Sequence, residues 1–304
     1  MQADAATRSD NKKYTKEHSI LFDLPRLLLK SPSGMTGFII VVIVMLIALC
    51  AGALMPYAPE EIDLVHMAEP PCWAEGGSTA HILGTDILGR DVFSRVLIGS
   101  RVSLLVGIFS VVVAGIIGTV MGLLSGYFGG WVDSVIMRIT DAFHSIPLTL
   151  FAMVILAVMR TGVLTLVFVI GVTTWPFYAR MIRSEVLGLK GQEYVKAART
   201  IGTSGIQIML KHILPNILPT FIVVSTLSVA TSILIEASLS FLGLGIQPPT
   251  VSWGVMLSDG RNYLATNWWM ATFPGIAISV TVLGIMLLGN WLRDVLDPKN
   301  QGLR

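Results

Sequence analysis

Charged residues are scarce in this sequence. Only 13% of its 304 residues are Asp, Glu, Lys or Arg, against about 25% in an ordinary soluble domain. Hydrophobic residues make up 53%. This composition argues against a soluble globular protein and favours one that lies largely in a membrane.

Motifs for nucleotide hydrolysis and metal catalysis are also missing. The dipeptide Gly-Lys never occurs, so the chain has no phosphate-binding loop of the Walker type. There is no His-Glu-x-x-His sequence, and the five histidines follow no metal-ligand spacing. Two cysteines, Cys50 and Cys72, do not indicate a disulfide framework. We therefore expect no catalytic site, metal site or cofactor in this chain, and an enzyme is the least favoured class.

Long stretches without Asp, Glu, Lys or Arg divide the chain. Each contains a run near the roughly 20 apolar residues that cross about 30 Å of hydrocarbon as a helix. A further uncharged stretch after Glu236 has too many Gly and Pro residues for a lipid-exposed helix. We predict an all-α membrane protein with six transmembrane helices. They are expected within residues 31–59, 102–132, 142–159, 161–179, 213–235 and 262–292.

Lys and Arg are concentrated on one side of this predicted topology. With the N-terminus inside, 16 of the 21 basic residues lie in inner segments. The positive-inside rule then predicts that both termini are cytoplasmic. We expect no signal peptide, because the first apolar run follows a polar stretch of about 34 residues. The five basic residues on the outer side are Arg90, Arg95, Arg101, Arg160 and Arg261.

The spans predict a division of the chain into five parts. The largest part is a five-helix core that contains a cytoplasmic loop at residues 183–214. The parts are a cytoplasmic tail with an interfacial helix (1–34), the first span (35–55), an extracytoplasmic segment (56–100), the core (101–292) and a cytoplasmic tail (293–304).

Glycines at regular spacing predict close helix packing at the end of the second span. Gly118, Gly122 and Gly126 form a tandem G-x-x-x-G pattern. Such glycines share one helix face and let another helix approach closely. The pattern leaves open whether the second helix belongs to this chain or to another.

A small charged cluster precedes the second span. Asp86, Arg90 and Asp91 lie close together in the sequence LGTDILGRD. A catalytic carboxylate pair would need a supporting nucleophile or histidine beside it. We interpret the cluster as a salt-bridged turn that opens the following helix.

Residues 193–216 are neither apolar enough for the bilayer nor polar enough for a plain loop. Tyr194, Ala197, Ala198 and Ile201 recur at the spacing of one helical face. Gly202 is typical of a residue that ends a helix. The pattern predicts a short helix with a small apolar face that fits a groove on a partner protein.

A second helix is predicted directly after that glycine. Ser204 is followed three positions later by Gln207, the spacing of a capping box. The predicted unit is therefore helix, glycine turn and helix, on the cytoplasmic side. Its second helix has an expected apolar stripe of Ile206, Met209, Leu210 and Ile213.

The same segment resembles a known motif. Ala197, Ala198, Gly202, Leu214 and Pro215 match the EAA loop of ABC importer permeases, which reads E-A-A-x-x-x-G, nine residues, I-x-L-P. Lys196 and His212 stand where that pattern has Glu and Ile. Further segments resemble the C-type permease subunit of dipeptide, oligopeptide and nickel importers. They include LGTDILGRDVFSR, SGYFGGWVD, SLSFLGLGIQPPTVSWGVMLSDG and LRDVLDP.

The resemblance implies a type I ABC importer permease in the cytoplasmic membrane of a bacterium or archaeon. Implied partners are a B-type permease, two ABC ATPase subunits that bind ATP and Mg²⁺, and an extracytoplasmic solute-binding protein, with no nucleic acid. It also implies that a helix at 193–205 couples the chain to an ATPase, and that Ala198→Asp uncouples transport. The expected coupling residues are Glu193, Tyr194, Lys196, Ala197, Ala198, Arg199 and Gly202.

The resemblance implies a di- or oligopeptide as the solute. Nickel, metal chelates or glutathione are alternatives within the same importer class. A secondary carrier or channel would need ionisable residues inside the spans, whose middles carry none. A membrane scaffold would bind the same partners without passing solute. Three residues near the outer end of the fifth span are expected on the translocation path: Glu236, Ser240 and Phe241.

Overall fold

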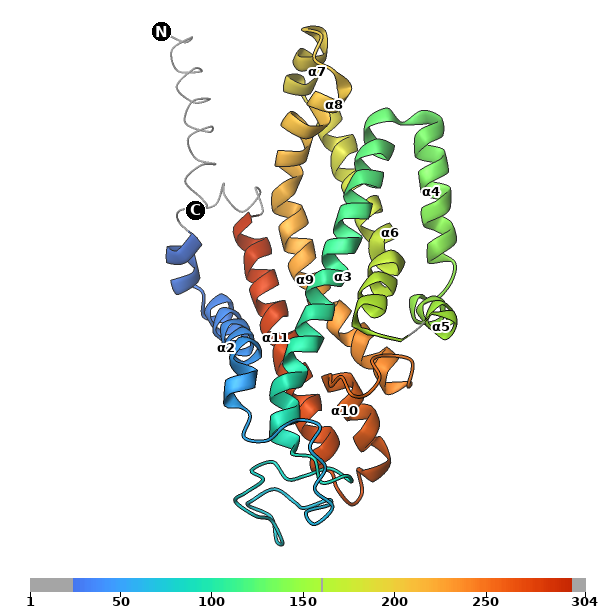
Figure 1. Ribbon diagram of the computed structural model, residues 1–304. Coiled ribbons are helices and arrows are strands. Elements are labelled where there is room, and N and C mark those ends of the chain that lie inside the picture. Colours follow the sequence, from blue (N-terminus) through green and yellow to red (C-terminus); the bar gives the residue numbers. More distant parts are fainter. Residues whose placement is uncertain (1–23, 160, 297–304) are drawn as a thin grey trace.

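A computed structural model describes residues 24–159 and 161–296, and the described chain is built from helices (Figure 1). Residues 24–29 are helical and α2 begins inside the predicted N-terminal tail at Pro32, whereas residues 1–23 of that tail lie outside the described residues. The main elements are α2 (Pro32–Leu54), α3 (Val92–Phe128), α4 (Gly130–His144), α5 (Leu148–Val158), α6 (Val163–Lys190), α7 (Glu193–Thr200), α8 (Gly205–Ile208), a π-helical turn (Met209–Ile213), α9 (Leu214–Phe241), α10 (Trp253–Gly260), a 3₁₀ turn (Arg261–Tyr263) and α11 (Trp269–Leu296).

Five helices are long and apolar enough to cross a membrane, and a bent pair brings the number of candidate spans to six. The five are α2, α3, α6, the continuous helix from Gly205 to Phe241, and α11. The prediction of an all-α membrane protein is therefore confirmed. Helix α3 begins at Val92, ten residues before the predicted uncharged stretch, because Asp91 caps its N-terminus. Its 37 residues measure about 55 Å, so it extends beyond the hydrocarbon layer.

The third predicted span is broken. The uncharged stretch 142–159 holds the last turn of α4 and the 11-residue helix α5. At about 16 Å, α5 is too short to cross alone. Helix α4 precedes it, and the two meet at an angle of 85°. Pro147 lies directly before α5 and has no N–H to continue the helical hydrogen bonds. The candidate span is therefore the α4–α5 pair.

The glycine pattern of α3 packs against α6 of the same chain. A Cβ added at Gly118 would lie 2.3 Å from Cβ of Tyr178. At Gly122 it would lie 2.7 Å from Cβ of Ile182, and at Gly126 2.7 Å from Cβ of Val186. The predicted close packing is confirmed, and its second helix, which the sequence left open, is α6.

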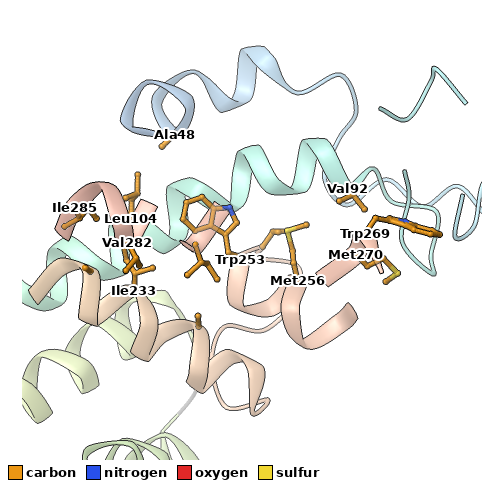
Figure 2. Close-up of a cluster of buried hydrophobic side chains, with 14 residues drawn as sticks. Ala48, Val92, Leu104, Ile233, Trp253, Met256, Trp269, Met270, Val282 and Ile285 are labelled. Atoms are coloured by element: carbon orange, nitrogen blue, oxygen red, sulfur yellow. The ribbon is translucent and has the colours of Figure 1, made fainter. Parts of the chain in front are cut away.

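A second core joins α2, α3, α9, α10 and α11 (Figure 2). Trp253 at the start of α10 and Trp269 at the start of α11 are buried in it. Their indole N–H groups donate to the carbonyls of Val96 and Thr85, both at 2.9 Å. These bonds satisfy the polar edge of each large ring, so both residues can be buried without an unpaired donor.

Residues 55–91 connect α2 to α3 and lie at the end of the molecule opposite α7 (Figure 1). Arg90 Nε contacts Asp86 Oδ2 at 2.6 Å. Asp91 accepts from the backbone N–H of Ser94 at 2.7 Å as the N-cap of α3. The predicted salt-bridged turn that opens the next helix is confirmed. Arg95 of α3 extends the ionic network to Asp259 of α10, 3.0 Å away.

Candidate partner-coupling site

The segment singled out by its sequence forms a projecting tip. Helix α6 continues past its apolar part to Lys190, and α7 follows after Gly191 and Gln192. Figure 1 shows α7 and α8 at one extreme end of the molecule, beyond the turn between α3 and α4. Because α6 continues to Lys190 and the chain is helical again from Gly205, the predicted loop 183–214 contains little irregular backbone.

The turn after α7 has the hydrogen bonds of a Schellman motif. The N–H of Thr203 donates to the carbonyl of Ala198 at 3.1 Å, and that of Gly202 to Arg199 at 3.1 Å. Gly202 has a φ of +83°, a conformation that costs glycine least. This geometry satisfies two carbonyls that the helix end would leave unpaired. The predicted glycine end of the helix is confirmed.

The predicted second helix is the beginning of a span. Ser204 Oγ accepts from the N–H of Gln207 at 3.4 Å as the N-cap of α8. The helix then runs without interruption to Phe241, through the π-helical turn at Met209–Ile213. This turn adds a residue to the local repeat, so Ile208, Met209 and Ile213 are buried. The predicted stripe is wrong at two positions, because Ile206 and Leu210 are exposed.

One side of α7 packs on this chain. Val195 and Ala198 are buried in a cluster with Tyr127 of α3, Ile182 of α6 and Ile208 of α8. The predicted face is therefore divided, because Ala198 points inward while Ala197 and Ile201 are exposed. An aspartate at position 198 would place a carboxylate in the chain's own core, so Ala198→Asp cannot test contact with a partner alone.

Tyr127 at the end of α3 packs against the residues of this projecting tip. The guanidinium of Arg199 and the ammonium of Lys190 each lie 5.7 Å from its ring centroid. Lys190 Nζ also donates to the Tyr127 carbonyl. A Cβ at Gly205 would lie 2.9 Å from the same ring. Sequence reasoning missed Tyr127, although it lies in the SGYFGGWVD segment that carried the resemblance.

The other side of the tip exposes apolar side chains. Ile201 is 81% exposed, Ile206 63% and Leu210 54%. Ala197 is exposed beside them. Ile206 and Leu210 lie in the first turns of the spanning helix Gly205–Phe241 and Ile201 lies in the turn before it. Exposed apolar side chains that gather at the end of a span are candidates for contact with another protein. We call these four residues the tip surface.

Polar side chains border the tip surface. Glu193 and Lys196 are exposed and form an ion pair of 3.0 Å one turn apart. The hydroxyl of Tyr194 accepts from Asn216 Nδ2 at 3.4 Å. An apolar centre with a charged rim is the usual anatomy of a protein–protein interface.

Two of the three residues expected on the translocation path lie inside the protein, and the third lies at its surface. Glu236 and Ser240 are buried, and Phe241 is partly exposed. The Glu236 carboxylate accepts from the hydroxyls of Ser252 at 2.7 Å, Ser240 at 2.9 Å and Ser103 at 3.3 Å. Glu236 therefore joins α3, α9 and the start of α10 inside the chain, and in this conformation neither it nor Ser240 lines an open surface.

The sequence shows which family contains this arrangement. Residues 118–302 match the model of the binding-protein-dependent transport system inner membrane component. The chain belongs to this family. Residues 23–71 match the N-terminal transmembrane domain of oligopeptide transport permease C. This permease subunit is a multi-pass protein of the cytoplasmic membrane, and the C-type resemblance stated from its motifs is confirmed.

Relatives align along most of the permease. It is 41% identical over 272 residues to the probable D,D-dipeptide transport system permease protein DdpC of Escherichia coli (strain K12), covering 90% of this chain and 89% of the relative. It is 42% identical over 275 residues to the glutathione transport system permease protein GsiD of Pectobacterium atrosepticum, covering 90% and 89%. It is 40% identical over 263 residues to the di/tripeptide transport system permease protein DppC of Pseudomonas aeruginosa, covering 86% and 87%.

Proposed function

We propose that this permease forms, with a B-type permease, the translocation path of an ATP-driven importer of di- and oligopeptides. The D,D-dipeptide, di/tripeptide and glutathione systems named for its relatives all carry short peptides, which supports this substrate class. An extracytoplasmic solute-binding protein delivers the peptide, and two ABC ATPase subunits bind ATP and Mg²⁺.

The observation that carries the proposal is the tip surface of Ala197, Ile201, Ile206 and Leu210. It lies at the α7–α8 end of the molecule (Figure 1). The same end carries Lys190 at the end of α6, and Lys196 and Arg199 in α7. The positive-inside rule assigns that end to the cytoplasm. The start of α2 and the end of α11 are both directed toward the α7 end of the molecule, which supports cytoplasmic termini (Figure 1).

The packing of α7 would allow movement of a bound ATPase to be transmitted to the membrane-spanning helices. The inner side of α7 is packed on Tyr127 of α3 and Ile182 of α6, so a displacement of α7 is transmitted to two spans. Helix α8 continues directly into α9. ATP-driven closure of the ATPases would move the tip and shift the permease between two packings. Such a shift requires only a difference in binding free energy between the two states.

The decisive experiment purifies the tagged permease from its native membrane in mild detergent. Mass spectrometry then quantifies a second permease and ATPase subunits in the same sample. We expect both with the wild-type chain. Ile201→Asp should retain the second permease and reduce the ATPase yield about tenfold or more, as loss of an interface hot spot does. Ile62→Asp is the matched control, because Ile62 is an exposed apolar residue at the opposite end.

Transport is measured with the same complexes in proteoliposomes. Labelled dipeptide should accumulate only with ATP, Mg²⁺ and the binding protein, and Ile201→Asp should abolish accumulation. Unlabelled glutathione, nickel ions and metal chelates serve as competitors that identify the solute class. Full ATPase retention by Ile201→Asp would contradict the docking assignment. Peptide uptake without ATP would contradict the importer proposal and favour a secondary carrier.

A further inference from the structure

Three potential metal ligands meet in the segment that joins α2 to α3. One ligand atom from each of Asp63, His66 and His81 lies within 4.8 Å of the other two. The imidazole rings of His66 and His81 have centroids 5.7 Å apart. The residues are separated by up to 18 positions in the sequence, so the fold rather than local spacing brings them together.

His81 is held in place by neighbours. It is buried, and its Nδ1 lies 3.0 Å from Asp91 Oδ1. Asp91 is itself fixed as the N-cap of α3. A carboxylate that accepts a hydrogen bond from Nδ1–H favours that tautomer and leaves the lone pair of Nε2 free to bind a metal, an arrangement that recurs behind metal-bound histidines. The ring of Tyr57 lies 4.7 Å from the His81 ring and limits its rotation.

Asp63 and His66 are partly exposed, so their side chains have room to rotate. Asp63 Oδ2 and His66 Nδ1 are 2.6 Å apart and share a hydrogen bond. Two ligand atoms on one Zn²⁺ ion are about 3.4 Å apart at the tetrahedral angle, from bond lengths of about 2.1 Å. The present cluster therefore needs rotation of these two side chains to close around an ion, which would replace the shared proton.

Negative charge accumulates next to the two histidines. Glu69 Oε2 is buried and has no hydrogen-bond partner among the described residues. Thr85 Oγ1 accepts from the backbone N–H of Glu69 at 2.9 Å and donates to the backbone carbonyl of His66, which holds these two residues close together. A buried carboxylate oxygen without a donor is costly unless a cation compensates it.

We propose that Asp63, His66 and His81 bind a divalent transition-metal ion, with Glu69 as the nearby carboxylate that completes its charge balance. Two imidazoles and a carboxylate match the ligand preference of Zn²⁺, whereas Mg²⁺ and Ca²⁺ prefer oxygen ligands alone. The ion would join residues 63–69 to His81, and through Asp91 to the first turn of α3. It would stabilise a connection that contains little regular secondary structure. This proposal does not depend on ATPase docking.

The test uses the full chain in detergent, purified without a polyhistidine tag and stripped with a chelator. Zn²⁺ is titrated against a competing fluorescent indicator, and bound metal is counted by mass spectrometry after gel filtration. We expect one Zn²⁺ per chain. His66→Gln and Asp63→Asn should each weaken binding at least tenfold. These two positions are partly exposed, so their substitution leaves the folded chain available for measurement.

The matched control is His144→Gln, which removes a histidine on α4, away from the cluster, and should bind Zn²⁺ like the wild type. Zn²⁺ should also raise the melting temperature of the wild type and the control, but not of His66→Gln. Wild-type affinity in both cluster variants would overturn the proposal, as would the absence of stoichiometric binding. Equal affinity for Mg²⁺ or Ca²⁺ would overturn the assignment to a transition metal.

Discussion

Arg183 of α6 binds Asp133 of α4 through two parallel contacts, Nε to Oδ1 at 2.5 Å and Nη2 to Oδ2 at 2.6 Å. Ser125 of α3 donates to the same carboxylate. One carboxylate therefore joins α3, α4 and α6. The planar guanidinium matches the carboxylate geometry, which a lysine ammonium cannot do.

Arg183→Lys should destabilise the permease by about 1.5–3 kcal/mol, the range for hydrogen bonds to charged groups. The measurement is the fraction that remains monodisperse on size exclusion after stepwise heating in detergent. Arg180→Lys is the control, because Arg180 pairs with Asp141 at 2.9 Å on an exposed surface. Equal melting of the two variants would contradict a structural role for the Asp133–Arg183 pair.

Gly118→Ala should destabilise the packing of α3 on α6 by about 1–3 kcal/mol, as overpacking does. Its Cβ would lie 2.3 Å from Tyr178 Cβ and 2.8 Å from the Trp175 carbonyl oxygen, and the backbone of α6 would have to move. Gly188→Ala is the control, because a Cβ there has no heavy atom within 4 Å.

Gly188→Ala should be neutral or stabilise the helix by up to about 1 kcal/mol, because alanine favours the helix over glycine. Both variants are compared by the same thermal assay. If Gly118→Ala melts like the wild type, the two helices are less closely packed than the structure shows.

Ala198→Asp should reduce the stability of the permease, whereas Ala197→Asp should reduce its retention of the ATPase. The first substitution would bury a carboxylate beside Val195 and Tyr127, so we expect a loss of stability in the isolated permease. Position 197 is exposed, so Ala197→Asp should keep the melting temperature of the wild type while ATPase retention falls. The two quantities are measured on the same preparations. Equal stability of the two variants would show that Ala198 is not part of this chain's core.

Glu236→Ala should destabilise the permease by about 2–4 kcal/mol. It removes the acceptor shared by Ser103, Ser240 and Ser252 and leaves a cavity where three segments meet. Glu236→Gln keeps the volume and one acceptor oxygen, and should cost less than about 1.5 kcal/mol. The same thermal assay compares the variants. Comparable losses for Gln and Ala would mean that the charge, and not the hydrogen-bonded framework, matters at this position.

Much of the fold could be predicted from local properties of the sequence. Transfer of a helix into lipid depends on the apolar content of that helix, so uncharged stretches located five of the six spans. Helix ends are also local, which explains why Asp91, Gly202 and Ser204 were placed correctly. The third span could not be placed in this way, because the 85° break between α4 and α5 separates a charged half from an apolar half.

The position of the candidate coupling site was predicted from the sequence. Which side of α7 packs on this chain and which side stays exposed was not. Helical periodicity grouped Ala197 with Ala198, and only the packing on Tyr127 decides which of them remains exposed. The π-helical turn shifted the buried positions to Ile208, Met209 and Ile213, a change that regular periodicity does not anticipate. A periodic pattern assumes a regular helix. It does not show which other part of the same chain will cover one face of that helix.

The sequence by itself determined the membrane class, the glycine end of α7 and the permease family, because partition into lipid, capping and motif order are properties of short segments. The tertiary structure alone decided that α6 receives the glycines of α3, that Glu236 is enclosed by three serines, and that Asp63 and His66 meet His81. These relationships join residues distant in the chain, and their free energies arise only when the helices pack.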